Sequence, residues 1–204
     1  SQDTTKDEFD WSLGQALRNG AFWYILVFLS MYNFSTSGVL FLRVPFWNDL
    51  GISPQAVALG VSMDPFTVIF AMLFFGFLAE RYPVRFMAVM GGFWRALSMI
   101  PLVMSGSLVW HVFFHNIIWG IGSGAFGATQ NLVFPTYYGR RAQGAIRGIS
   151  MPVMIIAGAS APPLCAFLVD SGLGIGAVWQ ITLGMMFVAG IGFYWIRPPV
   201  APNK

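Results

Sequence analysis

Two side chains that are charged at neutral pH lie deep inside long apolar runs of this sequence. Asp64 and Arg95 are each about nine residues into such a run, which places both near the middle of a bilayer-spanning helix at about 1.5 Å per residue. Ionisable groups at that depth are costly and typical of solute or ion pathways. Asp64 could carry a proton or pair with a coupling cation, and Arg95 could bind an anion. The alternative is a structural ion pair between the two.

A second polar group consists of His111, His115 and Asn116. A histidine titrates near neutral pH, so it can relay protons as well as hydrogen-bond a solute. We expect His115 and Asn116 to be candidates for substrate contact and His111 to lie nearer the membrane surface. A buried packing histidine is the alternative for His115. A metal site would need further ligands on the same face, and the sequence offers none, so no metal or other cofactor is expected.

The first apolar run carries a dense polar patch near its middle, from Tyr32 to Ser37. The patch covers more than one face of a helix, so some of its side chains must point into a helix bundle. Asn33 and Ser37 are four residues apart and share a face, which makes them the preferred pair for lining a cavity. Arg147 begins the fifth run, where its side chain is expected to reach back to lipid headgroups.

An enzyme of the six-helix intramembrane protease kind is not expected. Such a rhomboid-type enzyme needs Gly-x-Ser-Gly and a later histidine, but Ile121 stands where the glycine before Ser123 belongs, and no histidine follows His115. A serine without its base is not activated as a nucleophile.

The composition indicates which elements position these residues. Of 204 residues, 56% are hydrophobic and 9% are charged, whereas soluble domains carry about 25% charged residues. This excludes a soluble enzyme, and eleven basic against eight acidic residues leave no nucleic-acid surface. Apolar runs long enough to cross a bilayer lie at about 22–42, 55–79, 86–104, 108–134, 148–169 and 175–196. We therefore predict an all-α membrane protein with six transmembrane helices.

The basic residues predict the orientation of these helices. Six spans place both termini on one side of the membrane, and the opposite side has only Arg43. Because cytoplasmic segments are enriched in Lys and Arg, we expect both termini in the cytoplasm and the protein in the plasma (inner) membrane. Residues 7–19 are expected to form a short interfacial lead-in helix. The basic residues on the terminal side are Lys6, Arg18, Arg81, Arg85, Arg140, Arg141, Arg147, Arg197 and Lys204.

The connection between the second and third runs carries a recognisable motif, GFLAERYPVR, from Gly76 to Arg85. It resembles the G-x-L-a-D-R-x-G-x-[RK] cytoplasmic loop of the major facilitator superfamily. Glu80 stands for the usual Asp and Pro83 for the glycine, as in the weaker second copy of that motif. The resemblance implies a gating motif in which Gly76 allows close helix contact, Glu80 sits at a helix end, and Arg81 and Arg85 stay on the cytoplasmic face.

Two further stretches extend the resemblance over almost the whole chain. Residues 134–148, followed by Ala161-Pro162-Pro163 and Asp170, are similar to the tenth-to-eleventh helix region in the branch of monocarboxylate carriers and oxalate/formate exchangers. Residues 15–23 are similar to the start of a seventh helix. The resemblance implies helices seven to twelve of a twelve-helix transporter, whose N-terminal six-helix half is missing from this chain. In that family the first, second, fourth and fifth of these spans line the cavity, which favours Asp64 over Arg95 as a cavity residue.

The expected function is that of a secondary active transporter half, a symporter or antiporter that moves a small solute by alternating access. The branch and the basic cytoplasmic face favour a small organic anion. The expected partners are membrane lipid, the missing half and a small-molecule substrate, and no nucleic acid. The alternatives are a stand-alone six-helix channel and a non-transporting membrane receptor. The lack of a filter-like loop or charged ring weighs against the channel.

We expect a linker and lead-in over 1–20, the six-helix domain over 21–197 and a cytoplasmic tail over 198–204.

Overall fold

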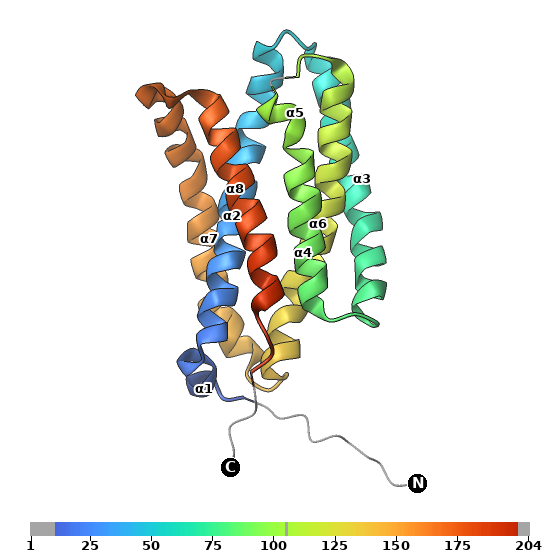
Figure 1. Cartoon of the computed structure of the whole chain (residues 1–204). Helices are drawn as coiled ribbons and strands as arrows, with labels where there is room; N and C mark the ends of the chain where they lie inside the picture. The colour runs from blue at the N-terminus through green and yellow to red at the C-terminus, as the bar shows by residue number, and fades with distance from the viewer. Residues whose placement is uncertain (1–10, 105, 200–204) are drawn as a thin grey trace.

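The computed structural model describes residues 11–104 and 106–199, and every regular element in these ranges is helical. In Figure 1 the long helices run alternately up and down between two ends of the molecule. We call these the α1 end, where α1 and the last turn of α8 lie, and the α5 end. The expected all-α class is confirmed. The elements are α1 (Leu13–Arg18), α2 (Gly20–Asp49), α3 (Pro54–Ala79), α4 (Val84–Ser98), α5 (Ile100–Val103), α6 (Val109–Tyr138), α7 (Gln143–Leu168), the π-helical turn η1 (Val169–Leu173) and α8 (Gly174–Trp195).

The helices match the six apolar runs, but the predicted end of the first run is wrong. α2 continues past residue 42 and through Pro45 to Asp49. A proline removes one backbone hydrogen bond, and tertiary packing can offset that loss. Here Phe46 packs edge-on against Trp179 of α8, with 5.3 Å between ring centroids. Arg43, expected in an external connection, therefore lies buried inside α2.

The helices have the length and composition of membrane spans. Four helical segments in the described ranges are long and apolar enough to cross a bilayer: α2, α3, α4 with α5, and the continuous run of residues 143–195. The last contains two passes, α7 and α8, because Gly172 and Gly174 adopt positive φ angles at the turn between them. α6 is not one of these four segments, but its 30 residues extend about 45 Å, well beyond an apolar core of about 30 Å.

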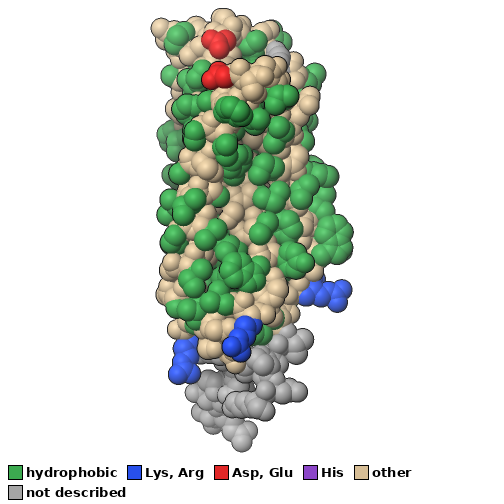
Figure 2. Space-filling model, turned by 90° about the vertical axis from the view of Figure 1, so that its left-hand side faces the viewer, with side chains coloured by type: hydrophobic (Ala, Val, Ile, Leu, Met, Phe, Trp, Pro, Cys, Tyr) green, Lys and Arg blue, Asp and Glu red, His purple; other side chains and the backbone are tan. Residues whose placement is uncertain are grey.

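One face of the molecule shows how a membrane would surround it. In Figure 2 a broad apolar band lies between acidic side chains at the α5 end and basic side chains toward the α1 end. An apolar belt with charges confined to its two rims is what a bilayer requires. The protein is an integral membrane protein.

The six long helices form two groups of three. α3 and α4 both pack along α6, whereas α2 packs along α7 and α8, and a contact between α4 and α8 joins the groups. Consequently α3 and α7 lie on opposite flanks of the bundle (Figure 1).

Glycines permit the closest helix contacts. A Cβ atom added at Gly120 would overlap the Thr67 side chain of α3, and one added at Gly124 would lie 2.6 Å from the backbone nitrogen of Met72. Gly120 and Gly124, four residues apart on α6, thus allow α3 to approach closely. Gly76 differs, because a Cβ added there would have no atom within 4 Å. Within the described ranges no other helix approaches Gly76 closely, so the close helix contact that the motif resemblance implies there stays a prediction.

Only some of the small residues of α7 lie at close helix contacts. Ala161 is buried, and a Cβ added at Gly38 of α2 would lie 3.8 Å from its side chain. Ala157 is only half-buried and borders an open groove between α2, α7 and α8.

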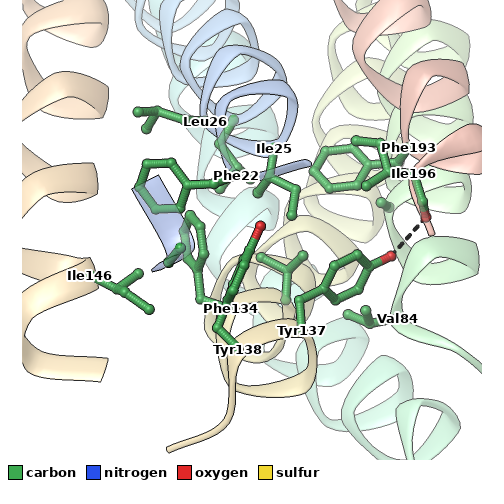
Figure 3. Packing of buried hydrophobic residues seen from close by; sticks show 14 of the residues in the cluster. Phe22, Ile25, Leu26, Val84, Phe134, Tyr137, Tyr138, Ile146, Phe193 and Ile196 are labelled. Atoms are coloured by element: carbon green, nitrogen blue, oxygen red, sulfur yellow. Dashed lines mark hydrogen bonds between the residues drawn. The ribbon is translucent and has the colours of Figure 1, made fainter. Parts of the chain in front are cut away.

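An apolar cluster closes the α1 end of the bundle (Figure 3). Phe22 of α2 packs against Phe134 and Tyr138 of α6, with ring centroids 5.6 and 6.1 Å apart. The Tyr137 hydroxyl donates a 2.9 Å hydrogen bond to the carbonyl of Ile196, drawn as the dashed line in Figure 3. The ends of α2, α6 and α8 are thus fixed to one another.

The lead-in helix is shorter than expected and is anchored to this end. α1 begins after Ser12, which forms a reciprocal capping box with Gln15. Trp11 is buried and meets the Tyr138 ring edge-on at 5.6 Å. Residues 7–10 of the expected helix lie outside the described ranges.

Candidate functional site

The carboxylate of Asp64 binds Arg43 rather than Arg95. Arg43 Nη2 donates to Asp64 Oδ2 at 2.8 Å, and the two side chains are 5% and 13% exposed. The continuation of α2 beyond residue 42 brings this arginine to the same depth as Asp64 on the antiparallel helix α3. The alternative of an ion pair between Asp64 and Arg95 is therefore wrong.

Arg95 is held mainly by aromatic faces. Its guanidinium lies 3.7 Å from the centroid of the Trp119 ring and 4.8 Å from that of Tyr32, a cation–π arrangement that gains strength in a desolvated site. Arg95 Nη1 also donates to the hydroxyl of Thr36 at 2.9 Å. Arg95 is 3% exposed, and within the described ranges no carboxylate forms a salt bridge with it.

Gly122 and Tyr32 border the site that the Arg95 side chain occupies. A Cβ added at Gly122 of α6 would lie 2.8 Å from Cγ of Arg95, so a larger residue would displace that side chain. The Tyr32 hydroxyl reaches across to the carbonyls of Gly91 and Gly122, at 3.3 and 3.2 Å. Tyr32 also stacks on Phe126, with 3.6 Å between centroids.

The charged groups meet around one tryptophan. Besides Arg95, the Arg43 guanidinium lies 5.9 Å and the His115 ring 5.4 Å from the Trp119 ring centroid. We call Arg43, Asp64, Arg95, His115 and Trp119 the Trp119 cluster. It draws on α2, α3, α4 and α6, and it sets two guanidinium cations against one carboxylate.

His115 of α6 binds the backbone of α4 from within this cluster. Its Nδ1 lies 2.7 Å from the carbonyl oxygen of Ser98, which can only accept, so Nδ1 carries the proton. The neighbouring Asn116 donates to the carbonyl of Val112 at 2.7 Å. Both side chains are fully buried within this bundle, and His111 is half-buried near the start of α6.

Several polar atoms of this region are buried without a protein partner. Buried polar groups are normally satisfied, so such a concentration indicates a place for water or a polar ligand. In the described ranges these atoms include three guanidinium nitrogens and three acceptors: Arg43 Nε and Nη1, Arg95 Nε, Asp64 Oδ1, His115 Nε2 and Asn116 Oδ1.

Exposure separates the candidate residues into two layers. The half-buried layer consists of Asn33, Thr36, Ser37 and Asp64. The buried layer consists of Arg43, Arg95 and His115. A solute outside this bundle can touch only the half-buried layer directly. The cations lie immediately behind it, since Arg95 binds Thr36 and Arg43 binds Asp64.

Asn33 and Ser37 do share a face of α2, but that face is turned toward α7. Ser37 Oγ would lie 3.0 Å from a Cβ added at Gly158, and Asn33 Cβ would lie 4.0 Å from it. Asn33 donates to the carbonyl of Leu29 at 2.8 Å, inside its own helix. The structure does not bring this pair into contact with the Trp119 cluster.

The proposed gating residues surround the turn between α3 and α4, at the α1 end. Glu80 caps α3, and Arg81 lies over the Phe77 ring at 4.8 Å. Arg85 lies over Phe86 at 5.3 Å. They lie together at one rim of the bundle, far from Asp64, as the sequence pattern predicts.

Apolar grooves also lie on the outside of the bundle. One of about 570 Å³ lies between α3, α4 and α6 and is lined by residues such as Phe70, Phe74 and Trp94. No group of three or more His, Cys, Asp or Glu side chains in the described ranges could hold a metal ion.

Sequence reasoning missed Arg43 and Trp119. Arg43 was expected outside the membrane because the first apolar run was predicted to end at residue 42, ahead of Asn48 and Asp49. The signal that could have placed it was Phe46-Trp47, two large apolar residues directly after Pro45. Trp119 has no sequence signal that separates it from the other tryptophans, since its role depends on what surrounds it.

The family model described as Major Facilitator Superfamily matches residues 22–204. No curated protein matches the chain.

Proposed function

Because this chain belongs to the major facilitator superfamily, whose members are transporters rather than enzymes, we propose that it is the C-terminal half of a secondary transporter for a small organic anion. The half would alternate access to a site near the membrane midplane, together with an N-terminal six-helix half. We also propose that the chain belongs to the branch of monocarboxylate and oxalate/formate carriers.

The observation that carries the choice of an anion is the charge of the Trp119 cluster. Two buried guanidinium groups face one carboxylate, and both retain N–H groups without a protein partner. An uncompensated buried cation is unfavourable, and an anion that accepts from those N–H groups removes the penalty. A cationic substrate would meet repulsion at the same place.

The route to these cations passes through the half-buried layer. Thr36 and Asp64 are partly exposed and each is bonded to one of the arginines. In this proposal the solute first contacts Thr36 and Asp64, and rearrangement of these contacts opens the arginines to it. His115 and Asn116 are buried behind this layer, where their side chains keep the surroundings of the two arginines polar.

We also propose which end of the bundle faces the cytoplasm. Basic residues such as Arg18, Arg81 and Arg197 lie at the α1 end, which would therefore be cytoplasmic under the positive-inside rule. Both termini would then be cytoplasmic, in the plasma (inner) membrane.

Cysteine accessibility tests alternating access in the complete two-half transporter. With all native cysteines replaced, including Cys165, Thr36→Cys is labelled by a membrane-impermeant thiol reagent added to either side. We expect labelling from both sides, and an anionic substrate should slow it. Labelling from one side only, unchanged by any anion, would contradict the proposal. Ser171→Cys is the control, because that residue is exposed at the turn between α7 and α8 and its labelling should not respond to anions.

The isolated chain provides a second test. One half offers only one wall of a cavity, so the purified 204-residue chain in liposomes should show no saturable uptake. Saturable, substrate-specific uptake by this chain alone would overturn the two-half architecture.

A further inference from the structure

An apolar groove opens between the start of α2 and the last turn of α8, at the α1 end of the bundle (Figure 1). Its volume is about 440 Å³, and its lining runs from Gly20 to Phe28 on α2 and from Gly192 to Arg197 at the end of α8. We infer that this α2–α8 groove binds one acyl chain of an anionic phospholipid, whose phosphate is held by Arg197. The inference goes beyond the proposed transport and does not depend on the transported solute.

The length of the groove fits an acyl chain. From Gly20 to Phe28 the lining follows about 12 Å of α2. One leaflet of a bilayer contributes about 15 Å to an apolar core of about 30 Å. A chain that runs alongside the helix therefore stays in the groove over most of its leaflet.

Small residues leave the groove open at the α1 end, and an aromatic ring ends it. A Cβ added at Gly20 would have only Tyr24 Cε2 nearby, at 4.0 Å, so that space holds little other protein in the described ranges. A Cβ added at Gly192 would overlap the ring of Phe28. The Phe28 ring thus fills the space beside α8 and forms the end of the groove farthest from the α1 end.

Two exposed aromatic residues border the groove. Tyr24 of α2 is 62% exposed and Trp195 of α8 is 68% exposed. Tyrosine and tryptophan combine an apolar ring with a polar group and are enriched where apolar chains meet headgroups. Their position indicates that the groove opens at the headgroup level.

Arg197 supplies a positive charge at this opening. It lines the groove and is exposed, and no carboxylate in the described ranges forms a salt bridge with it. Arg18, two residues before the start of α2, is a second exposed basic residue at the same end. Among the described acidic residues, Asp64 lies near mid-depth and Glu80 caps α3 in the other three-helix group. The remaining two, Asp49 and Asp170, lie at the α5 end.

This distribution of charge favours an anionic lipid. Basic pockets between transmembrane helices bind anionic headgroups, and one basic residue near the surface strengthens binding by about fivefold. A phosphatidylcholine headgroup also carries an ammonium group, which Arg197 repels. The groove is at the α1 end, away from the Trp119 cluster, so the bound lipid should anchor this end of the bundle without contacting the solute.

Quenching of Trp195 fluorescence by brominated lipid tests the inference. The complete transporter is reconstituted into phosphatidylcholine bilayers that contain increasing amounts of phosphatidylglycerol or phosphatidylcholine with the same dibrominated acyl chains. The contribution of Trp195 is the difference between wild type and Trp195→Phe. We expect half-maximal quenching at an about fivefold lower mole fraction of brominated phosphatidylglycerol than of brominated phosphatidylcholine.

One variant tests the charge and a second tests the groove. Arg197→Gln should abolish the preference for phosphatidylglycerol. Gly20→Leu, which places a side chain in the open part of the groove, should weaken quenching of Trp195 by phosphatidylglycerol. Gly176→Leu is the matched control, because it also adds a side chain to open space in the first turn of a helix, but at the α5 end.

A second tryptophan shows whether the preference is local. Trp110 is 56% exposed and lies at the start of α6, at the α5 end. Its contribution, measured against Trp110→Phe, should show no preference between the two lipids.

Several outcomes would overturn the inference. Equal quenching of Trp195 by both lipids, or a preference that persists in Arg197→Gln, would exclude recognition of the headgroup by this arginine. Unchanged quenching in Gly20→Leu would exclude the groove as the place of the acyl chain. If neither lipid quenches Trp195, protein covers the groove, through a second copy or another segment. Because none of these measurements uses a transported solute, their failure leaves the proposed anion transport standing.

Discussion

Arg43 and Asp64 form a 2.8 Å ion pair between α2 and α3, two helices that make few other contacts with each other. The pair joins the group α2, α7 and α8 to the group α3, α4 and α6. The bond from Arg95 of α4 to Thr36 of α2 crosses the same boundary. These polar contacts near mid-depth thus link the two three-helix groups in addition to the packing of α4 against α8.

Removing the cation of the ion pair should destabilise the protein. Arg43→Gln leaves the Asp64 carboxylate largely buried without its cation, at an expected cost of about 3–5 kcal/mol. The double variant Arg43→Gln with Asp64→Asn should recover most of this loss, since no unpaired charge remains. Thermal unfolding of the complete transporter in detergent measures both effects, with Arg197→Gln as the exposed control. Equal Tm values for Arg43→Gln and the control would rule out a structural contribution of the pair.

The crossing of α4 and α8 should tolerate no side chain. A Cβ added at Gly190 would lie 2.8 Å from Cα of Gly92, so Gly190→Ala must push the two helices apart. We expect a loss of about 1–3 kcal/mol, typical of overpacked contacts. Gly184→Ala on the same helix is the matched control, because a Cβ there would have no atom within 4 Å. A control variant as unstable as Gly190→Ala would show that helix propensity or another general effect, rather than the crossing, is responsible.

Arg81 should affect turnover more than binding. It lies at the rim of the bundle over Phe77, far from the Trp119 cluster, so its loss leaves the anion contacts intact. Arg81→Ala in the complete transporter should slow exchange several-fold with equilibrium affinity nearly unchanged, whereas Arg197→Ala should do neither. A large loss of affinity at normal turnover would contradict this assignment.

Asp64 should couple transport to protons. It is the one acidic residue of the described ranges that lies near the middle of a transmembrane helix, and it is partly exposed. Asp64→Asn should keep substrate exchange at equal pH but lose accumulation driven by a pH gradient, because the asparagine cannot carry the proton. Uptake into proteoliposomes with and without a gradient distinguishes these activities. Normal gradient-driven accumulation in the variant would remove Asp64 from the coupling step. A variant that misfolds and is rescued by Arg43→Gln would assign it a structural role instead.

The helices were predictable from sequence, since long apolar runs separated by glycine or proline turns are typical of membrane spans in a chain with so few charges. The depth of Asp64 and Arg95 was likewise apparent from their positions. Their partners were not. Which cation binds Asp64 depends on whether α2 ends before or after Pro45, and local sequence favours an end that packing of Phe46 and Trp47 overrides.

The role of Trp119 could not be predicted for a related reason. Its ring contacts side chains from α2 and α4, and glycines of α6 set the register of α6 against α3 and α4 through contacts that are long-range in sequence. A linear pattern indicates that such glycines favour close packing, but it does not indicate which faces meet.

The central claim is that the excess positive charge around Trp119 selects an anion. Counterflow by the complete transporter in proteoliposomes, with propionate, propionamide and propylammonium as solutes of similar size and different charge, tests it most directly. We expect saturable counterflow of propionate, little of either other solute, and loss of propionate counterflow in Arg95→Gln. Counterflow of propionamide or propylammonium at the propionate rate, or an Arg95→Gln variant with unchanged propionate counterflow, would contradict it.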